Sequence, residues 1–295
     1  MASLAFTKGH GTENDFVLLF DERGEIELTP ALVKFLCDRR AGIGADGVIR
    51  AVRAGALDAG KDFDASTWFM DYWNSDGTVS EMCGNGARVF GAFLEREAGV
   101  DARGGIVIGT RAGARTVTAL GSGKYSVGMG LWHLGEAGYG ERAPAAFDST
   151  VHAKGLNPAR PALSVDVGNP HHVVALASPT ELEGLDLTVP PTVAPVPPEG
   201  SNVEFAVTLG GEVIDGVAHG RLRMRVHERG SGETRSCGTG ACAAALAVKL
   251  WAGPGAPDIW DVEVPGGMVT VRVVGDRTTL SGPAVLVANG VVTVP

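Results

Sequence analysis

One cysteine motif occurs twice in this chain, and the repeat limits the possible folds more than any other feature. Cys83 opens the segment Cys-Gly-Asn-Gly-Ala, and Cys237 opens the segment Cys-Gly-Thr-Gly-Ala. In each copy a polar residue stands nine positions before the cysteine, and a helical pattern follows the motif. The two copies are separated by about half of the 295 residues. A single repeat of this length favours duplication of an α/β half over a solenoid, which needs shorter and more numerous repeats.

Three segments have the residue pattern of a helix. Residues 87–97 are apolar on one side and charged at their end, whereas residues 241–251 are apolar on nearly all sides. A helix of the second kind must be enclosed by other elements. Thr29 followed by proline is a helix-start signal, so we expect a third helix over residues 31–40, ending in basic residues.

Most of the remaining pattern indicates strands. Glycine-punctuated strands are expected over 104–130, a half-buried strand over 221–227 and several more strands over 261–294. The segment 190–198 contains five prolines and is expected to be an extended loop. Together these patterns predict an α/β (α+β) fold of two halves, each with strands wrapped around a central helix.

Composition excludes several classes of protein. The hydrophobic fraction of 44% is too high for a disordered chain. The net charge of −9 argues against a nucleic-acid partner, and no apolar run is long enough to span a membrane. Four cysteines are too few for a disulfide scaffold, and residues 1–10 lack the pattern of a signal peptide. We therefore expect a cytoplasmic protein.

A cysteine at the first turn of a helix has a distinctive chemistry when glycines follow it. The partial positive charge of the helix N-terminus favours a thiolate, so the thiol pKa is expected to fall toward neutrality. The glycines let a carboxylate approach the first backbone N–H groups. If the two motifs faced each other across a cleft, Cys83 and Cys237 could exchange a proton on opposite faces of one α-carbon.

Other roles for the cysteines are also open. Cys37 and Cys242 do not open a helix at a glycine loop, so we expect both to be core residues. A zinc site is disfavoured because paired ligand spacings are missing. A working disulfide between Cys83 and Cys237, as in a thiol redox or sensor protein, is the stronger rival.

At these residues the chain resembles the diaminopimelate epimerase family, and the resemblance extends over nearly the whole chain. Seven motifs carry it in order. They are Lys-Gly-His-Gly-Thr-Glu-Asn-Asp-Phe-Val at 8–17, Gly-Ile-Gly-Ala-Asp-Gly at 42–47, Tyr-Trp-Asn-Ser-Asp-Gly at 72–77, Met-Cys-Gly-Asn-Gly-Ala-Arg at 82–88, Gly-Asn-Pro-His at 168–171, Asn-Val-Glu-Phe at 202–205, and the segments 228–234 and 237–242 around the second cysteine.

The resemblance implies an isomerase that needs no cofactor and no metal. Such an enzyme interconverts LL- and meso-2,6-diaminopimelate on the route to lysine and peptidoglycan precursors, with Cys83 and Cys237 as the two acid/base thiols. It further implies a homodimer of two pseudo-symmetric halves, each mostly antiparallel strands around a central helix. The halves are expected at 1–132 and 133–283, with a last strand at about 284–295 returning to the first half.

The substrate of such an enzyme carries two carboxylates and two ammonium groups. Arg229 offers a bidentate fork to a carboxylate, and Glu228 can accept from an ammonium group. The resemblance implies a further set of binding groups, formed by side-chain amides and by backbone N–H groups at the two motifs. They are Asn14, Asn74, Asn169 and Asn202, and Gly84, Asn85, Gly238 and Thr239. His171 is expected to be a supporting polar group near a thiol.

One departure from the family and one related enzyme complicate this interpretation. Some family members carry Gln at the position of Gly47, so a substrate-side amide is expected to be missing here. A proline or hydroxyproline racemase-like enzyme would share the architecture. Arg229 and Asn74 argue against it, because a small cyclic substrate has no distal carboxylate for them to bind. No role is predicted for residues 136–159 or for the proline-rich segment.

Overall fold

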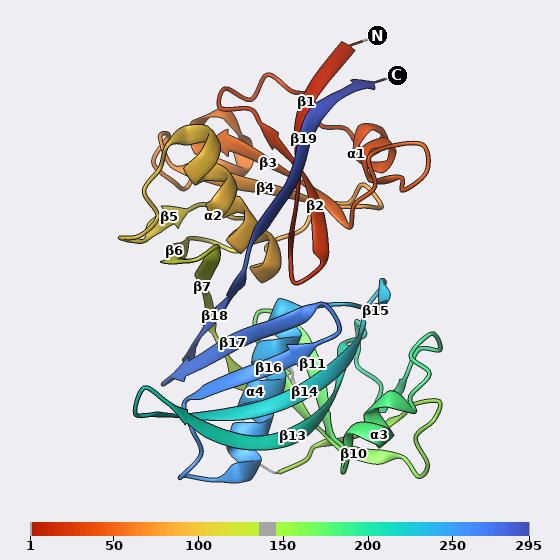
Figure 1. Cartoon of the computed structure of the whole chain (residues 1–295). Helices are drawn as coiled ribbons and strands as arrows, with labels where there is room; N and C mark the ends of the chain where they lie inside the picture. The colour runs from red at the N-terminus through yellow and green to blue at the C-terminus, as the bar shows by residue number, and fades with distance from the viewer. Residues whose placement is uncertain (1, 136–145, 295) are drawn as a thin grey trace. The chain divides into compact units, whose positions relative to one another are not determined.

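The computed structural model describes residues 2–135 and 146–294, and the chain forms two compact units (Figure 1). Unit 1 comprises Met1–Gly128 and Ser281–Pro295, and unit 2 comprises Met129–Leu280. Each unit contains a 15-residue helix that begins directly after one of the two motif cysteines. The predicted α/β class with strands around a central helix is confirmed.

Unit 1 is built on a five-stranded sheet with the order β19-β1-β2-β3-β4. The pair β2–β3 is parallel, and the other three neighbouring pairs are antiparallel. The strands are β1 (Ala2–Gly11), β2 (Asn14–Phe20), β3 (Gly47–Arg53), β4 (Trp68–Asn74) and β19 (Val285–Val294). The last strand of the chain thus forms one edge of this sheet, beside the first strand.

Helix α2 (Gly84–Ala98) packs against β1, β2, β3 and β19, and against β6 (Arg115–Gly121). Its residues from Gly84 to Leu94 are all buried. Gly99 ends the helix in the left-handed conformation, where a residue without a Cβ fits best. The strands of unit 1 therefore hold the start of α2 in a fixed position.

The remaining elements of unit 1 are short. Helix α1 (Pro30–Cys37) covers the sheet, with Val33 and Leu36 buried against it. Two 3-10 turns, η1 (Ala54–Ala56) and η2 (Asp58–Gly60), follow β3. A second set of strands consists of β5 (Ile106–Ile108), β6 and β7 (Lys124–Leu131), as the glycine-punctuated pattern predicts.

Unit 2 repeats the mixture of parallel and antiparallel pairing. Its strand order is β12-β9-β10-β11-β13-β14-β16-β17, with β11–β13 and β14–β16 parallel. The strands are β9 (Ser149–His152), β10 (Arg160–Asp166), β11 (Pro170–Ala175), β12 (Thr192–Ala194), β13 (Asn202–Ile214), β14 (Val217–Glu228), β16 (Ile259–Val264) and β17 (Gly267–Val274). Two short strands, β8 (His133–Leu134) and β15 (Gly232–Thr234), pair with β10 and β14, and β18 (Arg277–Pro283) leads back to unit 1.

Helix α4 (Gly238–Ala252) is the central helix of unit 2. It packs against β10, β11, β13, β14, β16 and β17, and Figure 1 shows these strands around it. Its residues from Gly240 to Val248 are buried. This enclosure confirms the prediction from its uniformly apolar sequence. A short helix, α3 (Pro179–Glu183), covers another part of the sheet.

Two local predictions need correction. The first helix ends at Cys37 rather than at residue 40, because the Asp38 side chain accepts the N–H groups of Arg40 and Ala41 and closes a turn there. The proline-rich segment is not wholly a loop. Its residues Thr192–Ala194 form β12, which pairs antiparallel with β9 at the edge of the sheet, a place where prolines outside the strand cost no ladder hydrogen bonds.

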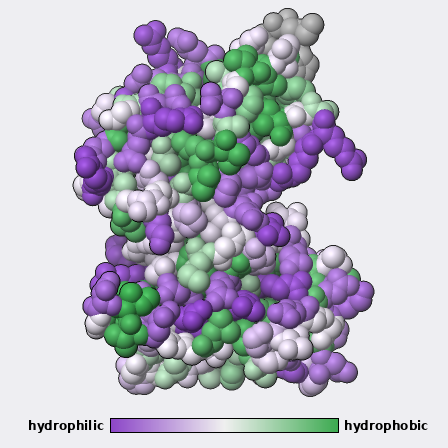
Figure 2. Space-filling model, in the orientation of Figure 1, coloured by the Kyte–Doolittle hydropathy of each residue, from purple (hydrophilic) through white to green (hydrophobic). Residues whose placement is uncertain are grey.

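Several further features complete the description. Cys37 and Cys242 are buried, as predicted, and burial raises the pKa of the Cys37 thiol to about 12. All helices of the described residues are too short or too polar to span a membrane. On the face shown in Figure 2, apolar residues form separate patches among polar ones. Of the uninterpreted stretch 136–159, residues 136–145 lie outside the described part of the chain.

A buried ion pair fixes β3 against β4. Arg50 donates from Nε and Nη2 to Asp71, at 2.9 and 2.7 Å, and both residues are buried. We expect Arg50→Leu to lower the free energy of unfolding by about 1.5–3 kcal/mol, because Asp71 loses the hydrogen bonds from Arg50 but keeps those from Arg111 and Trp73. Urea denaturation measures the change. The exposed pair Arg103–Asp101 is the control, and Arg103→Leu should leave the unfolding free energy nearly unchanged. Equal losses of unfolding free energy in the two variants would contradict a stabilising role for the buried Arg50–Asp71 pair.

Candidate active site

In unit 1 the predicted site is centred on Cys83, which is the N-cap of α2. Its Sγ accepts a hydrogen bond from the Gly86 N–H at 3.4 Å. The thiol is half-buried. The backbone N–H groups of Gly84 and Asn85 begin the helix beside it. This is the helix-end position that the motif predicts, where an anion is stabilised by the N–H groups and by the helix dipole.

The side chain of Asn14 lies against this thiol. Cys83 Sγ donates to Asn14 Oδ1 at 3.5 Å, and Asn85 Nδ2 donates to the same oxygen at 3.3 Å. The Nδ2 of Asn14 donates to Asp46 Oδ2 at 2.8 Å. Three predicted site residues, Cys83, Asn14 and Asn85, are therefore in direct contact.

Asn74 and Gly47 lie opposite each other on paired strands at the same end of the sheet. Asn74 Nδ2 donates to Thr78 Oγ1 at 3.1 Å. A Cβ at Gly47 would lie 2.5 Å from the Trp73 carbonyl oxygen and 2.7 Å from the Tyr72 ring. In this chain residue 47 therefore has no room for the glutamine side chain that some relatives carry.

In unit 2 the equivalent centre is Cys237, the N-cap of α4. Its Sγ accepts from the Gly240 N–H at 3.4 Å and lies 3.5 Å from Thr239 Oγ1. Only 5% of the residue is exposed. The Glu228 carboxyl group lies next to this thiol and accepts a hydrogen bond from Thr234 Oγ1.

His171 and Asn169 are linked to each other in the same unit. His171 is fully buried between Glu204 and Asn169, with Nδ1 2.7 Å from Glu204 Oε1 and Nε2 2.9 Å from Asn169 Oδ1. Within unit 2 its direct partners are therefore an acid and an amide. Glu204 is also fully buried, and its Oε2 has no hydrogen-bond partner among the described residues.

Asn202 and Arg229 are joined through the backbone. Asn202 Oδ1 accepts from the Arg229 N–H at 2.9 Å, so this amide holds the turn after β14. The guanidinium of Arg229 is exposed and donates from Nη1 to the Glu199 carbonyl at 3.1 Å. The charged end of Arg229 is thus held by one backbone contact at the surface of unit 2.

The two units place these residues at matching points of the repeat. Asn14 stands at the start of β2, and Asn169 stands just before β11. In both units the next strand of the sheet runs parallel, and it starts at Gly47 or at Asn202. The antiparallel partner of that strand ends at Asn74 in unit 1 and at Glu228 in unit 2. The same backbone positions therefore carry two side-chain amides and a glycine in unit 1, and two side-chain amides and a carboxyl group in unit 2.

One electrostatic prediction is wrong. We expected a helix-end thiol pKa near neutrality, but the pKa of Cys237 is raised well above its usual value. Desolvation by burial is the largest cause, and the charges of Glu228 and Glu204 raise the pKa further. The hydrogen bonds from Thr239 and from the Gly240 N–H oppose these effects but are weaker. Burial also raises the pKa of Glu228.

Comparison with known proteins gives the family. The sequence profile described as diaminopimelate epimerase matches residues 6–134 and 163–292. The chain is 46% identical to a diaminopimelate epimerase of Thermobifida fusca over 293 residues, 97% of each chain. It is 44% identical to that of Streptomyces coelicolor, covering 97% of this chain and 94% of that one. The chain belongs to the diaminopimelate epimerase family.

Solved structures with low sequence identity share the fold of this family member. A phenazine biosynthesis protein of the PhzF family from Bacillus anthracis superposes with a TM-score of 0.67, at 16% identity over the whole of both chains. A hydroxyproline epimerase from Agrobacterium vitis gives a TM-score of 0.61 at 15% identity, over 98% of this chain and 92% of that one. At such identities the likeness concerns the fold alone.

Three residues of this epimerase-family chain contact the predicted site but were not predicted to belong to it. They are Asp46, Arg88 and Glu204. All three stand inside motifs that carry the family resemblance, so a signal was present in the sequence. Their roles could not be predicted from the sequence, because the partners of a charged residue in a motif are known only from the folded structure.

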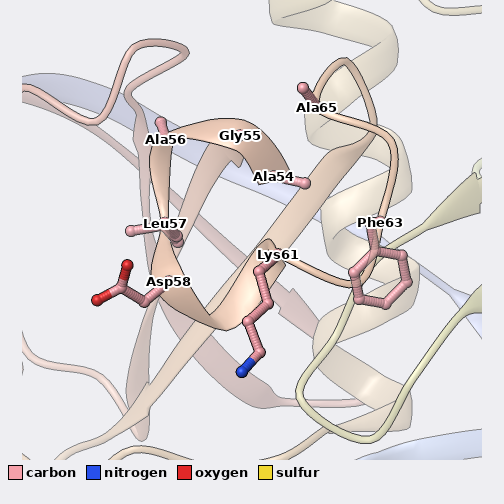
Figure 3. Close-up of a pocket in the computed structure, with 9 residues that line it drawn as sticks. Ala54, Gly55, Ala56, Leu57, Asp58, Lys61, Phe63 and Ala65 are labelled. Carbon is pink, nitrogen blue, oxygen red and sulfur yellow. The ribbon is translucent and has the colours of Figure 1, made fainter.

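A separate pocket does not coincide with the site. It has a volume of about 360 Å³ and is lined by η1, η2 and the following loop, including Leu57, Lys61 and Phe63 (Figure 3). None of the predicted site residues lines it. Within the described residues we also find no group of three or more His, Cys, Asp or Glu side chains that could hold a metal ion.

The raised pKa of Cys237 predicts a measurable effect of its neighbour. In the Cys83→Ser background, we expect Glu228→Gln to speed alkylation of Cys237 by iodoacetamide at pH 8 about tenfold. Removing a carboxylate that disfavours the thiolate lowers the thiol pKa and so increases the thiolate fraction at this pH. Glu233→Gln is the control, because it makes the same substitution at a carboxylate that pairs with Arg225 instead. An unchanged rate in the Glu228 variant would contradict the proposed electrostatic coupling.

Proposed function

We propose that this chain interconverts LL- and meso-2,6-diaminopimelate without a cofactor, by proton transfer between Cys83 and Cys237. The observation that carries the proposal is that each unit presents a cysteine as the N-cap of a glycine-rich helix start. The Asn14 amide contacts the Cys83 thiol, and the Glu228 carboxyl group lies beside the Cys237 thiol. Membership of the diaminopimelate epimerase family supports the choice of substrate.

The chemistry needs two groups of opposite protonation state. One thiolate takes the α-proton of the substrate and becomes a thiol, leaving a carbanion that is stabilised as an enediolate. The other thiol delivers its proton to the opposite face and becomes a thiolate. The number of protons is conserved, and the enzyme is left poised for the reverse reaction. This mechanism requires that both thiols reach the same α-carbon.

The difficult step is removal of a weakly acidic α-proton. Backbone N–H groups at a helix start can stabilise negative charge that develops on the substrate carboxylate. We assign this role to Gly84 and Asn85 at α2, and to Gly238 and Thr239 at α4. Each tenfold gain in rate corresponds to about 1.4 kcal/mol of transition-state stabilisation, so several such groups must act together.

The remaining polar residues suit the other groups of the substrate. We assign the distal carboxylate to Arg229, whose guanidinium is exposed and can form a bidentate pair. We assign an ammonium group to Glu228, and we assign the side-chain amides of Asn14, Asn74, Asn169 and Asn202 to either kind of substrate group, because an amide can donate or accept. His171 supports Asn169 through its Nε2.

Glu228 has a second role in the proposed reaction, as the proton partner of Cys237. The two side chains are neighbours, and burial raises the pKa of both. A carboxyl group with a raised pKa is a better proton acceptor for a buried thiol, because its proton affinity is closer to that of the thiol. Glu228 can therefore help Cys237 to lose and regain its proton.

We further propose a homodimer in the cytoplasm. A reducing compartment suits a mechanism that needs free thiols. The edge strand β19 supports self-association, because Val287 and Val291 on it are 60% and 69% exposed, and an exposed apolar edge favours pairing with another chain. Sedimentation of the wild-type chain and of a Val287→Lys, Val291→Lys variant tests this, with a dimer expected only for the wild type.

The central test is proton exchange at the α-carbon. In deuterium oxide with reductant, the protein should convert LL-diaminopimelate to the meso form and incorporate α-deuterium. Cys83→Ala and Cys237→Ala should each abolish epimerisation, because each removes one of the two proton carriers. Near-wild-type turnover in either variant would overturn the two-base assignment. Activity on proline instead would favour the racemase alternative, and activity that requires an oxidised Cys83–Cys237 disulfide would favour the redox alternative.

The assignment of Arg229 gives a separate prediction. We expect Arg229→Leu to lower kcat/KM for diaminopimelate by about 10- to 100-fold, because a charged hydrogen bond to the substrate is lost. Arg229→Lys should retain part of this activity, since the charge remains but the bidentate fork does not. Steady-state kinetics at constant ionic strength measures both. Equal kcat/KM in the wild type and the leucine variant would remove Arg229 from the binding site.

A further inference from the structure

A continuous chain of hydrogen bonds runs through the first half of the site. Arg88 Nη2 donates to Asn85 Oδ1 at 3.0 Å, and Asn85 Nδ2 donates to Asn14 Oδ1 at 3.3 Å. Asn14 Nδ2 then donates to Asp46 Oδ2 at 2.8 Å. The chain therefore begins at a cation and ends at a carboxylate, with two amides between them.

The two ends give this chain a fixed direction. A guanidinium can only donate, so Asn85 must turn its oxygen toward Arg88 and its NH₂ toward Asn14. An ionised carboxylate can only accept, so Asn14 must turn its NH₂ toward Asp46. Both constraints leave Asn14 with its oxygen facing Cys83, whose Sγ lies 3.5 Å away.

Burial makes the direction strict at one end. Arg88 is fully buried and Asn85 is 1% exposed, so water cannot readily replace a lost hydrogen bond there. Arg88 Nη2 also donates to Thr12 Oγ1 at 3.2 Å, which holds the guanidinium beside β1 and β2. A reversed Asn85 would set its NH₂ against a buried cation.

We propose that Arg88 and Asp46 are positioning residues that hold the Asn14 amide with its oxygen toward Cys83, so that this side chain favours the protonated thiol. The thiol then donates to Asn14 Oδ1 and accepts from the Gly86 N–H, which satisfies it in both directions. This inference rests on the proposed function of Cys83 as an acid/base group and adds residues that act through another side chain.

Other charged groups surround the same end of unit 1. The effect of their charges on the thiol pKa must be separated from the effect of hydrogen-bond direction. Asp15 accepts from Arg39 and from Lys8, and Arg39 also donates to Asp46 at 2.7 Å. Substitution of Asp46 or Arg88 therefore changes the local charge as well as the hydrogen-bond direction. The two changes are distinguishable because the charge effects have opposite signs: loss of Asp46 favours the thiolate, and loss of Arg88 disfavours it.

The logic of the chain predicts an unusual pattern of mutations. Either charged end alone is sufficient to fix the orientation of both amides. An amide that is oriented by one end orients its neighbour through the hydrogen bond between them. Asp46 Oδ2 also accepts from the Asp15 backbone N–H at 3.1 Å, so an asparagine at this position would keep its oxygen toward Asn14, and alanine is needed to remove the acceptor. Replacing Arg88 by glutamine alone, or Asp46 by alanine alone, therefore leaves Asn14 in place. Only replacing both ends allows the whole chain to reverse and turn the Asn14 NH₂ toward the sulfur, where it stabilises the thiolate.

The experiment measures the thiol itself, without substrate. In the Cys237→Ser background, the rate of Cys83 alkylation by iodoacetamide is followed against pH for Arg88→Gln, for Asp46→Ala and for the double variant. Cys242 is fully buried at 0% exposure and serves as the internal control by peptide mass spectrometry. Thiolate attack forms the S–C bond and releases iodide, so the rate reports the thiolate fraction.

The expected result is cooperative. The double variant should have an apparent Cys83 pKa about one unit below the value obtained by adding the two single shifts, which is about tenfold faster alkylation at pH 7. A double variant equal to that sum would overturn the proposal and leave Arg88 and Asp46 as simple charges. Because no turnover is measured, this result is independent of whether diaminopimelate is the substrate.

A second pair of variants keeps the test valid if loss of the buried guanidinium unfolds the protein. Asn85→Ala removes the hydrogen bonds that link Arg88 to Asn14, and it leaves Arg88 in contact with Thr12. Alone it should preserve the orientation of Asn14, which Asp46 still holds, and together with Asp46→Ala it should release it. The same extra fall in pKa is expected for this pair, and purely additive shifts would again contradict the inference.

Discussion

The hydrogen bond from a helix N–H to a cysteine sulfur is the interaction on which both half-sites depend. Gly86 donates to Cys83 and Gly240 donates to Cys237, each at 3.4 Å, so the thiol itself caps the helix. The glycines also allow close packing. A Cβ at residue 86 would lie 2.9 Å from Met70, and one at residue 240 would lie 2.7 Å from Glu204 Oε1. Because each helix start is clamped against its strands, the thiol position is set by the core of its unit.

The duplicated scaffold carries two different electrostatic environments. At Cys83 the contacting side chain is the amide of Asn14. Its orientation is fixed by Asp46, which it contacts directly, and by Arg88, which acts through Asn85. At Cys237 the carboxyl group of Glu228 lies next to the thiol, and the buried Glu204 lies beside the same helix turn. Duplication therefore preserved the backbone arrangement while the two thiols acquired neighbours of different charge. In the proposed reaction the two thiols hold opposite protonation states, and such a difference in environment suits that requirement.

The sequence predicted those features whose causes are local. The two motifs, the helices after them and the alternating strands depend on short-range patterns, and the structure contains them at the expected places. The end of α1 was missed because Asp38 closes a turn through its own side chain, and the following Arg39 pairs with Asp15 and Asp46 instead of extending the helix. The low pKa expected for Cys237 was wrong because burial outweighs the helix terminus. The first error arises partly from a local side-chain turn that the helix pattern does not reveal, and the second arises from tertiary burial that no local pattern contains.

The raised pKa of Cys237 links ionisation of this thiol to ligand binding in the proposed reaction. The same carboxylates that disfavour the thiolate attract a cation, so an ammonium group beside Glu228 offsets their charge. Because binding and deprotonation then favour each other by the same free energy, a bound substrate lowers the thiol pKa that the empty site raises. The empty site keeps its sulfur protonated and therefore poorly nucleophilic. Burial of Cys237, which opposes catalysis when considered alone, in this way restricts thiolate formation to the occupied site.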